Sequence, residues 1–199
     1  SSDLVDRALE FTRATADELG LSFKTLALQY SRLTAASLGT NLEGEKTEVI
    51  FRSISEAARV LRLTDEELAG SFKALTDIMS KGTIQAEELK GQLGDRFPGA
   101  VQIMAEALGI GTEELVKMME QGQLTSDALL DFATVISKRV APALPEAMKS
   151  ASASFERLRN SIFDVQTIVA QSGFVDALAK GAEDLAVALR DPALQQGLR

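Results

Sequence analysis

The stretch EKTEVIFRSISEAARVLRLTDEELAGSFKALTDIMSK, residues 45–81, decides the fold class. Apolar residues recur in its first half every three or four positions, which is the spacing of one face of an α-helix. We expect this helix to cover residues 45–61 and to bury Ile50, Ile54, Ala57 and Leu61. Thr64 and Glu67 then form the pattern of a capping box, which begins a second helix. Gly82 suits its end, so the stretch predicts two helices joined by a short turn.

The composition extends this prediction to the whole chain. Of the 199 residues, 45% are apolar and 25% are charged, which is ordinary for a globular domain with a sizeable core. Long runs of alternating apolar and polar residues, which would indicate strands, are missing from the sequence. We therefore predict an all-α fold, with a compact multi-helix domain and a C-terminal heptad-patterned helical arm or hairpin.

The same periodicity predicts the remaining helices of the domain. Two helices are expected before the quoted stretch, and three shorter ones follow it, at residues 98–108, 112–121 and 125–140. Pro98 is expected at the first position of its helix, and Thr125 as the N-cap of the last one. Pro142 and Pro145 then interrupt the pattern. This interruption predicts a helical domain over residues 1–141 and an arm over residues 146–199.

The domain contains a candidate internal repeat, between residues 58–93 and residues 105–133. The pattern Met-x-x-Gly-x-apolar occurs at residues 79–84 and again at residues 119–124, with acidic and leucine positions that also correspond. Upstream, residues 58–68 match residues 105–115 at an offset longer by about two helical turns. A true duplication and convergence on a common helix–glycine–helix joint both explain the match.

The arm begins with a strict heptad pattern of apolar residues. Their spacing alternates between three and four over three repeats, and the seam consists of Met148, Ala151, Phe155, Leu158, Ile162, Val165 and Val169. The rhythm resumes after Gly173, from Val175 to Leu189. Two structures fit this seam: a coiled coil between copies of the chain, and a hairpin that packs back onto the domain.

The sequence offers little catalytic chemistry. Cysteine and histidine are both absent, which removes disulfides, cysteine nucleophiles, histidine-based triads and the common zinc sites. Adjacent carboxylates are expected to cap first helical turns rather than to catalyse, at Glu66–Glu67, Glu87–Glu88 and Glu113–Glu114. Arg157 and Arg159 are expected on a solvated face of the arm, and Tyr30 in the core. We therefore predict no catalytic, cofactor or metal site, and a protein that is not an enzyme.

The charge and hydropathy of the chain limit the classes of partner that it can bind. The net charge of −8 disfavours direct binding to nucleic acid, and no apolar run reaches the roughly 18 residues of a spanning helix. The sequence starts without methionine and ends within a helical pattern. We expect it to be a piece of a longer protein.

Three segments in the middle of the chain form a specific pattern: MSKGTIQAEEL at residues 79–89, GQLGDRFPGA at residues 91–100 and MAEALGIGTEELVKMMEQGQL at residues 104–124. Together they resemble the N-terminal tape-measure domain of phage tail-length tape measure proteins. A looser match extends over residues 22–147. In the second segment we expect a fixed structural joint, with Phe97 packed into the core, made by Gly91, Gly94, Arg96, Phe97, Pro98 and Gly99.

The resemblance implies a structural protein of the phage or prophage virion. Tape measure proteins lie in the lumen of the tail tube as parallel homo-oligomers, and their length sets the tail length. It implies tail tube protein and tail assembly chaperones as partners, synthesis in the bacterial host cytoplasm, and ejection ahead of the DNA. The alternatives are a non-catalytic helical adaptor or scaffold that binds a partner helix, which needs an open apolar groove, and a membrane-active helical protein.

Overall fold

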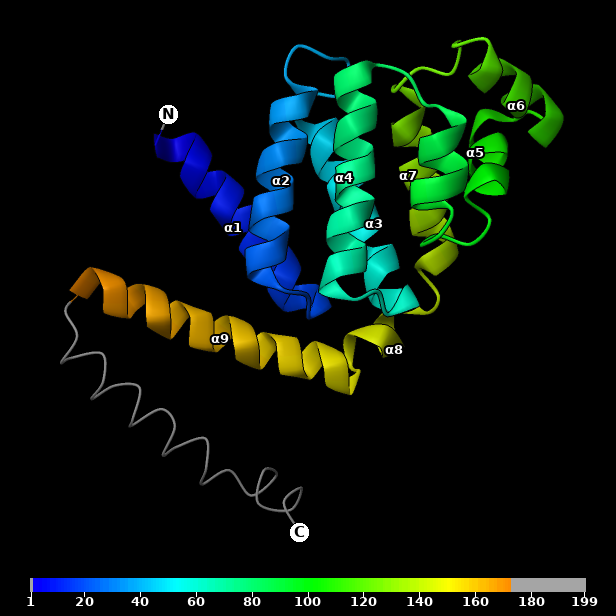
Figure 1. Ribbon diagram of the computed structural model, residues 1–199. Helices are drawn as coiled ribbons and strands as arrows, with labels where there is room; N and C mark the ends of the chain where they lie inside the picture. The colour runs from blue at the N-terminus through cyan, green and yellow to red at the C-terminus, as the bar shows by residue number, and fades with distance from the viewer. Residues whose placement is uncertain (1, 173–199) are drawn as a thin grey trace. The chain divides into compact units, whose positions relative to one another are not determined.

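A computed structural model describes residues 2–172, in which helices are joined by turns and loops (Figure 1). The helices are α1 (Ser2–Leu19), α2 (Phe23–Ser37), α3 (Glu45–Leu61), α4 (Asp65–Lys81), the π-helix η1 (Glu87–Leu93), α5 (Ala100–Leu108), α6 (Thr112–Glu120), α7 (Ala128–Val140), α8 (Leu144–Met148) and α9 (Ala151–Ser172). Within this described range the only β-pairing is an isolated antiparallel bridge between Thr83 and Thr125. The predicted all-α fold is confirmed.

The chain divides into two compact units, Ser1–Arg157 and Leu158–Arg199. Helix α9 therefore begins in the first unit, which we call the head, and continues into the second. The predicted boundary between residues 141 and 146 remains a prediction. The continuation of the heptads from Val175 to Leu189 lies outside the described residues.

Four aromatic rings join the first four helices in the core of the head. The Phe51 ring on α3 stacks on Phe72 of α4, with ring centroids 4.8 Å apart, and meets Tyr30 of α2 edge-on at 4.9 Å. Phe11 of α1 lies 5.1 Å from Tyr30. Such pairs bury large apolar areas in preferred geometries. The expectation that Tyr30 belongs to the core is confirmed, and α1 to α4 share one core.

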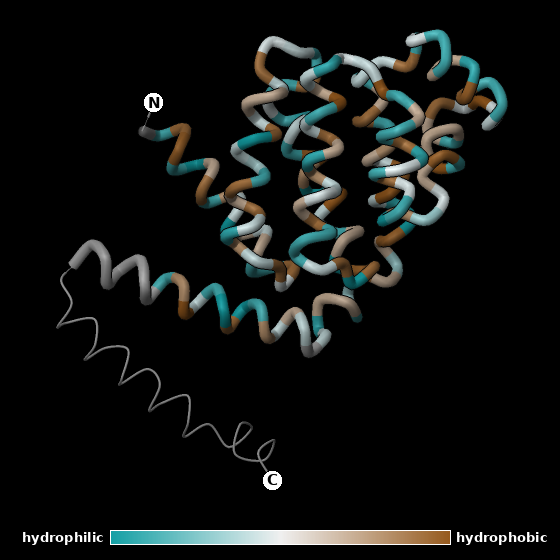
Figure 2. The backbone as a smooth tube through the Cα atoms, viewed as in Figure 1, coloured by the Kyte–Doolittle hydropathy of each residue, from teal (hydrophilic) through white to brown (hydrophobic). Residues whose placement is uncertain are grey.

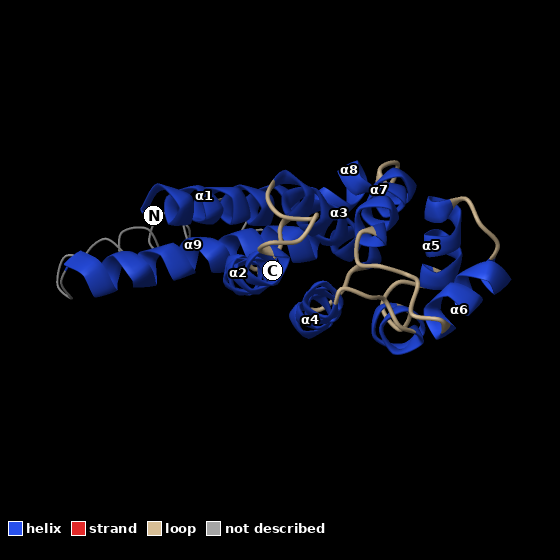
Figure 3. Cartoon of the chain, turned by 90° about the horizontal axis from the view of Figure 1, so that it is seen from above, coloured by secondary structure: helices blue, strands red, loops and turns tan. Residues whose placement is uncertain are grey.

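Helix α3 lies at the centre of the head. Seen from above, it lies between α2 and α7 (Figure 3), and α7 packs in turn against α5. Ser137 of α7 donates to the Glu56 carboxylate of α3 at 3.2 Å, so a polar contact accompanies the apolar packing. Brown and teal segments alternate along these helices in Figure 2, as amphipathic helices require.

The quoted stretch folds as its pattern predicts. Helix α3 covers residues 45–61, and Thr64 caps α4 through a full capping box with Glu67. Gly82 ends α4 in the left-handed conformation, with φ at 81°. Ile50, Ile54 and Ala57 are buried, but Leu61 is 41% exposed. The prediction for Leu61 was wrong because it is the last residue of α3, where fewer neighbouring helices cover the surface.

Two predicted helix starts were also wrong. The helix predicted from Pro98 begins at Ala100, because Gly99 takes a left-handed conformation that ends the preceding turn. The helix predicted from Thr125 begins at Ala128, because the bridge to Thr83 holds Thr125 outside the helix. The segment at Glu87–Leu93 is helical but in the wider π form. Among the described residues, no helix is long and apolar enough to cross a membrane.

Candidate functional site

The segment predicted as a joint connects η1 to α5 through a tight turn. Gly94 caps the π-helix in an ordinary right-handed conformation, with φ at −61°. A Cβ atom at Gly94 would lie 2.2 Å from the Lys90 carbonyl oxygen, a distance that no side chain tolerates. Lys90 lies in η1, four residues before Gly94, so this carbonyl belongs to the turn that Gly94 ends. Gly94 is therefore needed for close approach and not for a positive φ.

The other two glycines of the joint differ from Gly94 and from each other. Gly99 has φ at 82°, which favours glycine because a Cβ is strained in this region. Gly91 does not have a positive φ, and a Cβ atom at this position would meet no other atom within 4 Å. The structure thus gives a physical reason for glycine at residues 94 and 99, and none at residue 91.

Arg96 and Phe97 hold the joint against the rest of the head. The Arg96 guanidinium donates to the Gln92 carbonyl at 2.5 Å and lies over Gly70 of α4 so closely that a Cβ there would be 2.5 Å from its Nη2. Phe97 is 2% exposed, as expected, while Pro98 beside it remains exposed. These contacts tie the turn to α4 on one side and to the core on the other.

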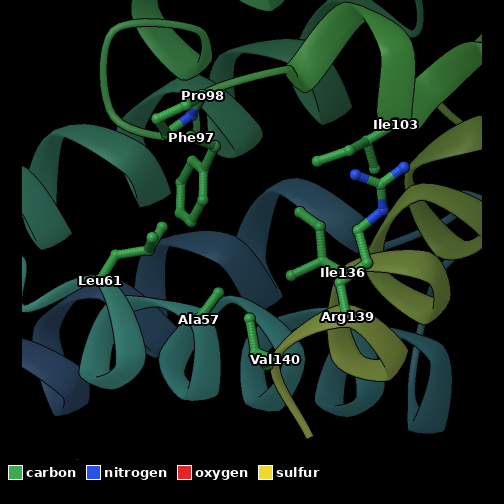
Figure 4. Close-up of a pocket in the computed structure, with 8 residues that line it drawn as sticks. All are labelled: Ala57, Leu61, Phe97, Pro98, Ile103, Ile136, Arg139 and Val140. Atoms are coloured by element: carbon green, nitrogen blue, oxygen red, sulfur yellow. The ribbon is translucent and has the colours of Figure 1, made fainter. Parts of the chain in front are cut away.

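Phe97 and Pro98 also line an open apolar groove of about 170 Å³, drawn in Figure 4. The α3 residues Ala57 and Leu61 form one wall, and α5 and α7 contribute Ile103, Ile136, Arg139 and Val140. Arg139 forms an ion pair with Glu106 of α5. The groove has room for about one apolar side chain, since a leucine or phenylalanine side chain fills most of that volume.

The two loops of the candidate repeat lie against each other. Ile84 donates its N–H to the Leu124 carbonyl at 2.8 Å, and Ser126 donates to the Gly82 carbonyl at 2.9 Å. A left-handed glycine follows each preceding helix, Gly82 with φ at 81° and Gly122 with φ at 66°. The matched glycines therefore share a backbone conformation, and the matched residues Ile84 and Leu124 are joined by a hydrogen bond.

The upstream halves of the candidate repeat share a second feature. Arg62 after α3 and Gly109 after α5 are matched positions, and both are left-handed, with φ at 56° and 67°. The next residue in each case donates its N–H back into the helix, Leu63 to Ala58 and Ile110 to Ala105, both at 3.0 Å. Both helices thus end in a Schellman-type turn.

The predicted seam residues are placed in different surroundings. Met148 belongs to α8 and packs against the hydrophobic core of the head, whereas Phe155, Leu158 and Ile162 on α9 are each more than half exposed. Ala151, Val165 and Val169 lie on α9, but their side chains are outside the described residues. The structure therefore brings together only the middle of the seam, as an exposed apolar stripe.

Arg157 was predicted on a solvated face of the arm, but it is half-buried and bound to the head. Its guanidinium donates to the backbone carbonyls of Asp17 at 2.8 Å, Glu18 at 3.1 Å and Met148 at 2.9 Å. The carbonyls at the end of α1 lack partners within their own helix, so the guanidinium satisfies them. The acceptors in α1 lie far from Arg157 in the sequence, so no local sequence pattern could predict these contacts.

Arg59 of α3 makes a second set of contacts with the start of α9. It is 5% exposed and donates to Ser152 Oγ at 2.8 Å, to Ser150 Oγ at 3.3 Å and to the Gly20 carbonyl at 2.6 Å. Burial lowers the pKa of Arg59 from its ordinary value, and the nearby Glu156 carboxylate acts in the opposite direction. Sequence reasoning missed Arg59, because a basic residue in the last turn of a helix is ordinary.

The carboxylates behave as structural groups. Glu67 completes the capping box, and Glu88, which is 1% exposed, pairs with Lys81 and accepts the Gln85 N–H at 3.0 Å. Over residues 2–172, no group of three acidic side chains converges to hold a metal ion. These carboxylates stabilise helix ends and joints.

The comparisons with known proteins agree with these features. The sequence profile of the family described as "Tape measure protein" matches residues 1–171. A protein named "Probable tape measure protein" of Salmonella phage Felix O1 is 37% identical over 141 residues. That match covers 71% of this chain and 18% of the phage protein, so this chain corresponds to a small part of its length. No solved protein structure matches significantly.

A profile match over most of the chain establishes the family and agrees with the predicted resemblance. The expectation of a structural rather than a catalytic domain is confirmed by this membership. The chain belongs to the tape measure protein family, whose members are components of the phage virion tail.

Proposed function

We propose that this chain is the head and the first ruler helix of a protein that sets the length of a phage tail. The observation that carries the proposal is α9, a helix of 22 residues. Its apolar side chains Phe155, Leu158 and Ile162 are each more than half exposed. A helix advances about 1.5 Å per residue, so a long helical region has a length fixed by its residue count. A head followed by such a helix combines an assembly unit with a ruler.

The proposed partners follow from the same arrangement. The apolar stripe at heptad spacing suits a parallel homo-oligomer, in which other copies cover it. We place this oligomer in the lumen of the tail, where tail tube protein polymerises around it and tail assembly chaperones coat it beforehand. Synthesis in the host cytoplasm and ejection ahead of the DNA complete the proposed cycle.

The groove beside Phe97 bears on the alternative function, a helical adaptor. An adaptor that holds a partner helix needs pockets for several anchors, at positions such as i, i+3, i+4 and i+7. A groove of about 170 Å³ takes about one of these anchors. This groove therefore gives no support to the adaptor.

Tail length measured by electron microscopy tests the ruler. In the full-length protein, deleting about 70 residues from the helical region that follows this chain should shorten tails by about 100 Å, because each helical residue spans about 1.5 Å. Tails of normal length after this deletion would contradict the ruler and leave the adaptor as the better function.

The joint should influence assembly and not length. Gly94→Val places a side chain against the Lys90 carbonyl, so we expect fewer complete tails, all of normal length. Gly91→Val is the matched control, because the space around that position is open. Shortened tails in the Gly94 variant would show that the joint belongs to the ruler.

A further inference from the structure

A polar pocket lies in the head where the end of α3 meets the first residues of α4 and α9. It has a volume of about 730 Å³ and adjoins a second pocket of about 460 Å³. Arg59, Arg62 and Ser150 line both, so we call the two together the arginine pocket. A water molecule takes about 30 Å³ in the liquid, so the arginine pocket has room for a group much larger than a single ion.

Arg59 is a buried cation whose hydrogen-bond acceptors are neutral. It is 5% exposed, and in the described part of the chain it donates only to two serine hydroxyls and to the Gly20 carbonyl. Its Nε atom is buried and has no hydrogen-bond partner there. The Glu156 and Asp65 carboxylates attract the guanidinium only at longer range. A buried charge is costly unless an opposite charge compensates it, so an anion bound in the arginine pocket would lower this cost.

Arg62 places a second cation at the pocket. Its side chain is exposed and makes no ion pair with any residue that the structure describes. Its backbone has φ at 56°, a left-handed conformation that glycine adopts more easily, and the matched turn after α5 has Gly109 at this position. A strained residue that makes no ion pair of its own points to a role for its side chain toward a ligand.

Two helices also begin at the arginine pocket. Thr64 caps α4, and Ser150 Oγ accepts the Ala153 N–H at the start of α9. Helix N-termini carry a partial positive charge and favour anions. The hydroxyls of Ser150 and Ser152 both accept from Arg59 and lie 3.2 Å apart, so at least one of their hydrogens is left for a ligand. Guanidinium groups, a hydroxyl group and two helix N-termini therefore converge where an oxyanion would bind.

We infer that the arginine pocket binds the carboxylate of an aspartate or glutamate side chain of a partner polypeptide. Asp65 and Glu156 also line the pocket, so they favour a single negative charge over the many phosphates of a nucleic acid. The net charge of −8 acts in the same direction. Leu21 and Leu63 give the pocket an apolar part, which suits the residues beside an acidic side chain. This binding is independent of the proposed ruler.

Titration with acetate, followed by NMR of the isotope-labelled chain, tests the carboxylate site. Acetate should shift the Arg59 Nε–H and Ser152 backbone signals together along one saturable curve. Acetamide has the same shape without the charge and should shift neither signal. Arg62→Gln should weaken acetate binding about fivefold or more, because a charged hydrogen-bond donor is lost. Arg32→Gln is the matched control, since Arg32 is exposed on α2 and does not line the pocket.

Both variants should keep the melting temperature of the unmodified chain, because neither side chain is buried. Acetate shifts that do not saturate, or equal shifts with acetamide, would overturn the inference. Equal acetate binding by the Arg62→Gln and Arg32→Gln variants would overturn it as well. Inorganic phosphate is the second probe, and tighter binding of phosphate than of acetate would show that the pocket is not a carboxylate site.

Selection from a library of random displayed peptides tests the kind of partner. Peptides that bind the unmodified chain are kept, and those that also bind the Arg62→Gln variant are removed. The remaining peptides should be enriched in aspartate or glutamate, and acetate should compete with them. A selection that leaves no peptide, or peptides without an acidic residue, would overturn the inference. Tail length does not enter either measurement, so a failure of the proposed ruler would leave this result unchanged.

Discussion

Ile84 donates its backbone N–H to the carbonyl of Leu124 at 2.8 Å, and both side chains are almost fully buried. These are matched positions of the candidate repeat, so each loop closes against its counterpart. The pairing joins the segment after α4 to the loop after α6. This hydrogen bond is one of the two that form the bridge between Thr83 and Thr125.

Truncating either residue of this pair should destabilise the head. We expect Ile84→Ala and Leu124→Ala each to lower the free energy of unfolding by about 2–4 kcal/mol, because a cavity remains where each side chain was. The double variant should lose less than the sum, since the two side chains share one environment. Urea unfolding measures these values, with the 45% exposed Val49 changed to Ala as a control near zero. Strict additivity would mean that the loops do not act together.

Two glycines of the joint, Gly94 and Gly91, allow a paired test of where the structure requires glycine. Gly94→Ala should lower the free energy of unfolding by about 1–3 kcal/mol, because its Cβ would overlap the Lys90 carbonyl. Gly91→Ala should be neutral or stabilising by less than about 1 kcal/mol, because alanine restricts the unfolded chain. Thermal melting of both variants gives the comparison. Equal losses of stability at the two positions would contradict the explanation that Gly94 is needed because the Lys90 carbonyl is so close.

Arg62 occupies a conformation that suits glycine better. It is the one non-glycine residue with a positive φ among those the structure describes, and its counterpart in the repeat is Gly109. Arg62→Gly should raise the free energy of unfolding by about 0.5–1 kcal/mol, and Gly109→Ala should lower it by about 1 kcal/mol. Opposite shifts in melting temperature would establish the equivalence of the two turns. A destabilised Arg62→Gly variant would indicate that the arginine side chain makes a favourable contact.

The stability of the head should fall in alkaline solution. Burial raises the pKa of Tyr30 above its ordinary value of 10.0, and the Glu48 charge adds to this shift. The folded state then holds the phenol proton more tightly than the unfolded state. This contribution is complete below pH 10.0 and is lost as the pH rises through the higher pKa of folded Tyr30.

Tyr30 is the single tyrosine and the chain has no tryptophan, so phenolate absorbance reports this group alone. The absorbance titration of the folded protein should have its midpoint above that of the unfolded chain. Tyr30→Phe should weaken the loss of stability near and above pH 10.0. Coincident midpoints in the folded and unfolded protein would contradict the burial of the hydroxyl.

Truncation locates the end of the head. A chain ending at Arg157 keeps the contacts of Arg59 and Gly20, and we expect it to melt like the full chain. A chain ending at Pro145 leaves the buried Arg59 without Ser150 and Ser152, so its free energy of unfolding should fall by about 1–3 kcal/mol. Equal melting temperatures of the two truncated chains would favour the boundary predicted between residues 141 and 146. Limited proteolysis that cuts in that segment and leaves a folded core would favour it as well.

The sequence alone determined the features that neighbouring residues control. The limits of α3, the capping box of Thr64 and Glu67 and the stop at Gly82 all depend on residues within one or two helical turns. Ile50, Ile54 and Ala57 were recognisable as core for the same reason, because helical periodicity places them on one face. The family could also be recognised, since its segments are continuous in the sequence.

Only the tertiary structure decided the features that need partners from elsewhere in the chain. The sequence pattern placed Arg157 in solvent, yet its acceptor at Asp17 lies 140 residues away. Thr125 looked like a helix cap until its bridge with Thr83 was seen, and the close approach of Gly94 to the Lys90 carbonyl is visible only in the structure. The heptads of α9 indicated an apolar face, but the contacts of its first residues with α1 and α3 are made by Arg59 and Arg157, far apart in the sequence. Packing between distant segments sets these positions, and its energy is absent from any local sequence pattern.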